Sequence, residues 1–163
     1  MGTIFTLKTS SFDPKKPLPN KYVFNDSGCS GENISPALEW SGAPSETKSF
    51  AVTVFDPDAP TGHGWWHWTV VNIPANINRL EEGASNDHRL PSGVIEGKTD
   101  YGQIGYGGAC PPTGDKAHRY VFTVYALKSE KMNINPKTSG TVLKESLDAE
   151  SLAKASFTVE YSR

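Results

Sequence analysis

The chain has few cysteines, no long apolar run and no excess of basic residues. Its 163 residues include only two cysteines, Cys29 and Cys110, which are too few for a disulfide scaffold and lack the paired spacing of a zinc site. We therefore expect free thiols, unless the fold brings their two loops together. No segment approaches the roughly 18 apolar residues that a spanning helix needs. Stable membrane insertion is not expected either, because no amphipathic membrane-binding segment is present.

The charge balance argues against nucleic-acid binding. Lys and Arg number 16 and Asp and Glu number 18, for a net charge of -2, and no run of basic residues is present. A protein that neutralises phosphates along a nucleic acid needs a basic face. The first residues lack the charged start, apolar core and cleavage site of a signal peptide, so we expect a cytoplasmic protein. The length predicts a single domain over residues 1–163.

Twelve prolines and fifteen glycines are scattered between short apolar runs. This pattern is typical of a mainly β domain with long loops. The expected strands cover residues 4–8, 22–24, 48–56, 66–73, 119–127 and 156–161. The stretches 50–56 and 120–127 are nearly all apolar, so both should lie centrally in a sheet. A helix is expected after Ser139, because apolar residues recur there at helical spacing up to Leu147, with Leu152 as its continuation; residues 74–99 are expected to form a long loop.

Polar residues gather where several of these strands end. They lie in the segments 56–60 (Asp-Pro-Asp-Ala-Pro), 64–68 (Gly-Trp-Trp-His-Trp), 111–114 (Pro-Pro-Thr-Gly) and 118–120 (His-Arg-Tyr). Proline lacks the N–H that strand pairing requires, so the prolines indicate that the sheet stops here. The pattern predicts a small polar pocket at the strand ends.

An anion is the ligand that these residues suit best. The candidate donors are protonated His67 or His118, the Tyr120 hydroxyl and the backbone N–H groups of residues 107–110. Asp56 would repel an anion directly, so we expect it to orient a histidine. Trp65 and Pro112 would form the rim, whereas Trp66 and Trp68 belong to the core. Arg119 is expected to form a structural ion pair, and Asp58 to cap its turn.

A metal site is the first alternative. Asp56, Asp58, His63 and His67 are all suitable ligands, but glycines and tryptophans around the two histidines favour a turn and then a strand. In an extended strand four residues span about 13 Å, too far for His63 and His67 to share one ion. We therefore expect no metal.

A hydrolase that uses Cys110 as nucleophile and His118 as base is the second alternative. No Gly-x-Ser-x-Gly sequence is present, and no helix is expected after Cys110 that would activate its thiol. The stretch 105–108 (Gly-Tyr-Gly-Gly) matches neither a phosphate-binding loop nor a dinucleotide fingerprint. No cofactor is expected.

The combined motifs resemble the phosphatidylethanolamine-binding protein family, which includes Raf kinase inhibitor proteins. The resemblance rests on segments 56–60 and 111–120, and segments 32–40, 65–74 and 99–102 resemble its bacterial and archaeal branch in particular. It extends from about residue 24 to residue 163. It implies a large central antiparallel sheet, a smaller second sheet and a C-terminal helix, with an anion pocket at one edge. The chain departs from the family at Ala109, where bacterial relatives commonly have proline, and at Cys110, where animal relatives have glycine.

The resemblance also implies a site and a function. The implied pocket residues are Asp56, Trp65, His67, Ala109, Cys110, Pro111, Pro112, His118 and Tyr120, with Asp58 and Arg119 beside them. The implied function is non-enzymatic binding of a small phosphorylated ligand, with a protein kinase or protease as candidate partner. Inhibition of a kinase or protease through a surface loop remains an alternative. Bacterial relatives can form homodimers, although no apolar helix face here requires one.

Overall fold

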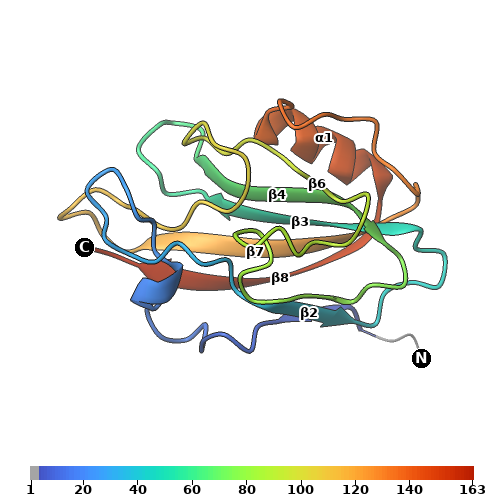
Figure 1. Cartoon of the computed structure of the whole chain (residues 1–163), viewed down its shortest axis with the longest axis horizontal. Helices are drawn as coiled ribbons and strands as arrows, with labels where there is room; N and C mark the ends of the chain where they lie inside the picture. Colours follow the sequence, from blue (N-terminus) through green and yellow to red (C-terminus); the bar gives the residue numbers. More distant parts are fainter. Residues whose placement is uncertain (1–3) are drawn as a thin grey trace.

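Two antiparallel β-sheets and one α-helix make up the computed structural model, which describes residues 4–163 (Figure 1). The five-stranded sheet has the order β6 (Ile95–Glu96), β4 (Trp65–Pro74), β3 (Ser49–Asp56), β7 (His118–Leu127) and β8 (Ser151–Tyr161). The three-stranded sheet has the order β1 (Thr6–Lys8), β2 (Leu38–Ser41) and β5 (Arg79–Leu80). The fold class predicted from the sequence is confirmed.

Strand β3 lies at the centre of the large sheet, between β4 and β7. Its residues alternate between two cores: Val52 and Val54 belong to the core that includes the small sheet, and Ala51 belongs to the core beneath the helix. Figure 1 shows the small sheet and the helix on opposite sides of the large sheet. Because both faces of β3 are covered, most of its residues are apolar, on both faces.

Helix α1 (Gly140–Glu150) starts where the sequence predicted. The Ser139 side chain accepts a hydrogen bond from the N–H of Val142, which caps the helix. Leu143 and Leu147 are buried against Tyr125 and other residues of the large sheet. The helix therefore covers part of one sheet face, as expected.

Three expectations about local structure were wrong. Leu152 does not continue the helix but lies in β8, because the alternating residues 151–161 pair with β7 along its whole length. Residues 22–24 are not a strand: Tyr22 ends the short 3-10 helix η1 (Asn20–Tyr22), and Val23 forms only an isolated bridge with Ala109. The segment 74–99 is not all loop, since it contains β5 and β6.

The strand ends that carry the polar residues meet at one end of the large sheet. Asp56, the last residue of β3, pairs with Trp65, the first residue of β4. Phe55 pairs with Val121 near the start of β7. Since β3 is antiparallel to both neighbours, its end and their beginnings lie side by side.

Candidate functional site

A pocket of about 300 Å³ opens at this end of the sheet. Eight of the nine predicted pocket residues line it: Asp56, Trp65, His67, Cys110, Pro111, Pro112, His118 and Tyr120. Five further lining residues were not predicted: Ser27, Ala59, Pro60, Thr61 and Tyr101. Its volume suits a small ligand and lies at the lower end of the range for small-molecule sites.

His118 lies between two carboxylates on the β7 side of the pocket. Its Nδ1 is 2.7 Å from Asp56 Oδ2 and its Nε2 is 3.0 Å from Asp115 Oδ2. Both His118 and Asp56 are buried, whereas the Asp115 side chain is about 40% exposed. Burial alone would lower the pKa of His118, but the hydrogen bonds to Asp56 and Asp115 outweigh it and raise the pKa. A protonated His118 donates from both nitrogens and has no N–H left for a ligand.

Asp56 is fixed by the turn that follows it. Its Oδ1 accepts a hydrogen bond of 2.8 Å from the N–H of Asp58, which leaves Oδ2 for His118. Asp58 forms an ion pair with Arg119 of β7, at 2.9 Å from the guanidinium, and this pair lowers the pKa of Asp58 to about 2. The ion pair of Arg119 is thus present, whereas Asp58 does not cap its turn: Asp56 caps it, and both Asp58 carboxylate oxygens bond to Arg119. The orienting role of Asp56 stays a prediction that this geometry allows.

His67 is held differently on the β4 side. Its Nδ1 lies 2.8 Å from the carbonyl oxygen of Gly107 and 3.1 Å from that of Gly108, so Nδ1 carries the hydrogen. Burial lowers the pKa of His67, and these carbonyl contacts oppose the shift only in part. The side chain is therefore a neutral imidazole near neutral pH, and its Nε2 is the nitrogen that a ligand can reach.

The loop 107–110 does not provide the ligand donors expected at Gly107 and Gly108. The N–H of Gly107 donates to the His67 carbonyl at 2.8 Å, and the N–H of Gly108 donates to Asn33 Oδ1 at 2.7 Å. Ala109 is buried behind the pocket, where its carbonyl accepts from the N–H of Phe24. These groups shape the wall and are already satisfied by the protein.

Two other donors at the pocket are unsatisfied. Within residues 4–163, Tyr120 Oη and Trp65 Nε1 are buried atoms without a hydrogen-bond partner. Burial, with the nearby Asp56 charge, raises the pKa of Tyr120, so its hydroxyl stays protonated and able to donate. Buried polar atoms without a partner are uncommon in folded proteins. Trp40 Nε1, outside the pocket lining, is a third such atom, so it is the place of Tyr120 and Trp65 in the lining that makes them candidate donors to a ligand.

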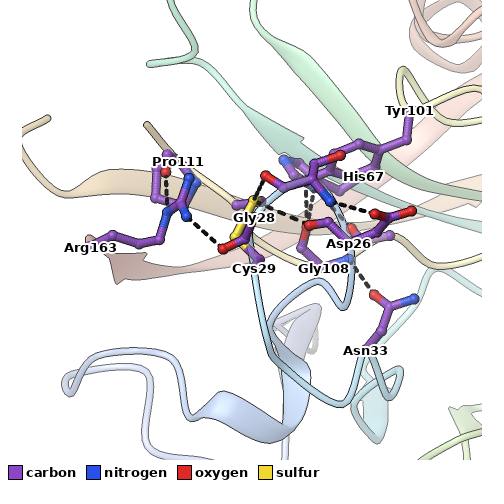
Figure 2. Close-up of a disulfide and its surroundings, with 12 residues drawn as sticks. Asp26, Gly28, Cys29, Asn33, His67, Tyr101, Gly108, Pro111 and Arg163 are labelled. Carbon is purple, nitrogen blue, oxygen red and sulfur yellow. Dashed lines mark hydrogen bonds between the residues drawn. A yellow bond between two sulfur atoms is a disulfide. The ribbon is translucent and has the colours of Figure 1, made fainter. Parts of the chain in front are cut away.

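Tyr101 is the main pocket residue that the sequence reasoning did not select. Its hydroxyl donates to the Gly108 carbonyl at 2.8 Å, and its ring stacks on Phe24 with 3.8 Å between centroids. It also packs edge-on against Trp65 and His67, and Figure 2 shows Tyr101 beside His67 and Gly108. The stretch 99–102 is one of the segments that carry the family resemblance, so a signal for this residue is present in the sequence.

Cys29 and Cys110 form a disulfide across 81 positions of the chain, which corrects the expectation of free thiols (Figure 2). The spacing of two lone cysteines gives no sign of such a pairing. A sulfur held in a disulfide is not a nucleophile, so the bond counts against the hydrolase that uses Cys110 and His118, which stays a prediction. Structural disulfides are rare in the cytosol, so the bond counts against the cytoplasmic location, which stays a prediction.

The described part of the chain also bears on a metal site and on a membrane span. Among residues 4–163, no three His, Cys, Asp or Glu side chains are grouped so that they could hold a metal ion. Over the same residues, no helix has both the length and the apolar character needed to cross a bilayer.

The fold and pocket define a class of two-sheet β protein with a small buried pocket at one end of the large sheet. Residues 8–162 match the family model described as phosphatidylethanolamine-binding protein. The chain is 48% identical over 159 residues to the UPF0098 protein YbcL of Escherichia coli, covering 96% of this chain and 87% of YbcL. It is 49% identical over 146 residues to YbhB of the same organism, covering 89% of this chain and 92% of YbhB.

The crystal structure of E. coli YbcL, described as a new member of the mammalian PEBP family, superposes with a TM-score of 0.94 at 48% identity. The match covers 98% of both chains. The chain belongs to the phosphatidylethanolamine-binding protein family.

Proposed function

We propose that the protein is a non-enzymatic binding protein for a small anion, with a phosphoryl group as the part that enters the pocket. The observation that carries this proposal is the pair of buried donors, Tyr120 Oη and Trp65 Nε1, that have no acceptor within residues 4–163. An anionic oxygen is the strongest acceptor for such donors, because a hydrogen bond to a charged group is worth more than one between neutral groups.

The charges around the pocket are compatible with an anion. Asp56 is the buried carboxylate of the lining, and its charge is compensated by protonated His118 at 2.7 Å. His67 is neutral and gains an N–H at Nε2 only when it takes up a proton, because Nδ1 already faces two carbonyls. An anion in the pocket would favour this protonation, so we expect affinity to increase as the pH falls below the ordinary imidazole range.

The test compares two tyrosine variants that each lose one hydroxyl. Phosphorylethanolamine is titrated by calorimetry into the wild type and into Tyr120→Phe, which keeps the ring and removes the unsatisfied donor. We expect the affinity to fall about tenfold or more, as for a lost hydrogen bond to a charged group, while stability stays level or rises by about 0–1 kcal/mol.

Tyr106→Phe is the matched control. The Tyr106 hydroxyl donates to the Tyr22 carbonyl at 2.7 Å and does not line the pocket, so this variant should lose stability but bind the probe as the wild type does. Equal affinity for wild type and Tyr120→Phe would contradict the proposal. A kinase or protease partner, an inhibitory surface loop and a homodimer stay predictions.

A further inference from the structure

One wall of the pocket is formed by a turn that belongs to no helix or strand. Ser27 lines the pocket and lies in the turn 26–29, which is closed by a hydrogen bond of 3.0 Å from the Cys29 N–H to the Asp26 carbonyl. Ser27 and Gly28 have φ angles of 57° and 89°, in the left-handed region. Residues 25–28 are exposed, so little apolar packing holds this turn in place.

The neighbouring part of the wall is the segment 110–112, which consists of Cys110 and the two prolines of the pocket. Just before the turn, the Phe24 N–H donates a hydrogen bond of 2.9 Å to the carbonyl of Ala109, which precedes the segment. Nearer the tip, Cys110 Sγ lies 3.6 Å from the Ser27 carbonyl oxygen and 3.8 Å from that of Asp26, and two stronger connections join the turn to the segment. One is the disulfide, and the other is Arg163, which donates to Gly28 and Pro111 carbonyls at 3.0 and 2.7 Å (Figure 2).

We propose that the Cys29–Cys110 disulfide is a redox-sensitive clasp on the ligand pocket, so that binding is strong when it is closed and weak when it is reduced. This inference rests on the proposed function, because it describes the regulation of that same pocket. Cys110 lines the pocket and is half-buried, so a small thiol can approach its sulfur from the pocket mouth.

The chemistry is a thiol–disulfide exchange with a small dithiol as reductant. The dithiol gives up two electrons and two protons and becomes a cyclic disulfide; the bond between the two cysteine sulfurs breaks, and each sulfur takes one proton. After reduction, the exposed hydrogen bond from Arg163 to the Gly28 carbonyl still holds the turn. The turn then samples open positions. The apparent affinity becomes the affinity of the closed pocket multiplied by the fraction of time that the pocket is closed.

The experiment measures phosphorylethanolamine affinity for the oxidised protein, for the protein reduced with dithiothreitol and for the double variant Cys29→Ser/Cys110→Ser. We expect the reduced protein and the double variant to bind on the order of tenfold more weakly than the oxidised protein. Dithiothreitol should not change the affinity of the double variant. Leu147→Ala, in the core beneath the helix, is the control that lowers stability but leaves the affinity of the oxidised protein unchanged.

Amide hydrogen exchange of residues 24–31 is measured on the same samples, because it reports the opening of the turn in the absence of a ligand. Reduction should accelerate exchange in this segment while the large-sheet strands stay protected. Equal affinity, or equal exchange of residues 24–31, in oxidised and reduced protein would overturn the clasp. If the oxidised protein does not bind the probe at all, the proposed function fails, and the exchange data alone decide whether the clasp exists.

Discussion

Each side of the pocket holds one buried histidine, and the two histidines have opposite kinds of hydrogen-bond partner. On the β4 side, His67 donates from Nδ1 to the carbonyls of Gly107 and Gly108, and burial lowers its pKa. On the β7 side, His118 lies between the carboxylates of Asp56 and Asp115, which raise its pKa. Both imidazoles are 3% exposed. Burial lowers the pKa of both side chains, and only the two carboxylate partners of His118 reverse that shift, so the partners decide which of the two imidazoles is charged.

The difference separates two tasks within one pocket. His118 is a permanent part of the frame, because its charge compensates Asp56 and both of its nitrogens are occupied. His67 keeps a free Nε2 and can change its charge when a ligand arrives. This contrast predicts that His67, and not His118, responds to a ligand, and the changes below test it.

The largest expected effect is on stability, from Asp56→Ala. Removing this carboxylate breaks a buried ion pair and leaves His118 with only the exposed Asp115. We expect the free energy of unfolding to fall by about 3 kcal/mol, measured by urea denaturation. Asp58→Ala is the control, since it breaks the more exposed pair with Arg119 and should cost about 1 kcal/mol or less. Equal losses in the two variants would contradict the role given to Asp56.

The second effect is the separation of the two histidine titrations, measured by nitrogen-15 NMR of the imidazoles. His118 should stay protonated above its ordinary pKa of 6.5, and His67 should become protonated only below it. The stability from His118 is fully present below pH 6.5 and is lost as the pH rises through its raised pKa. The contribution of His67 has the opposite sign: it is lost as the pH falls from 6.5 toward its lowered pKa. Two superimposed titration curves would show that the partners do not set the charge.

The smallest effect is expected from Asp115→Asn. Asp115 adds a negative charge beside the pocket and occupies the Nε2 of His118. Neutralising it should lower the pKa of His118 and raise the affinity for phosphorylethanolamine about fivefold, as expected for removing one nearby charge at a protein surface. Calorimetry at low and high salt checks the electrostatic origin, because the gain should shrink as salt screens the charge. Unchanged or weaker binding would place Asp115 outside the electrostatics of the site.

Much of the fold could be predicted from local sequence patterns. The apolar runs of β3 and β7 identified the centre of the large sheet, and the spacing after Ser139 identified the helix. The errors fall where tertiary contacts decide the conformation. Residues 22–24 have strand-like composition, but their backbone bonds to the loop at Ala109, and Leu152 fits a helical spacing but pairs with β7.

The pocket could be predicted where its residues lie at strand ends, because proline and polar residues mark those ends. Ser27 and Tyr101 come from loops whose approach to the pocket depends on the whole fold. The disulfide could not be predicted, since two isolated cysteines in separate loops say nothing about their distance in space. The amides of Gly107 and Gly108 were expected to serve a ligand, and only the structure shows that His67 and Asn33 already occupy them.

The most direct test is an NMR titration of the imidazole and indole nitrogens with phosphorylethanolamine at pH 6 and pH 8. Inorganic sulfate, which does not titrate in this range, separates protonation of the protein from that of the probe. We expect His67 Nε2 and Trp65 Nε1 to shift together and saturably, more strongly at pH 6, while His118 changes little. If His118 alone responds, or if no nitrogen shifts at either pH, the anion is not held by the unsatisfied donors of this pocket and the account is wrong.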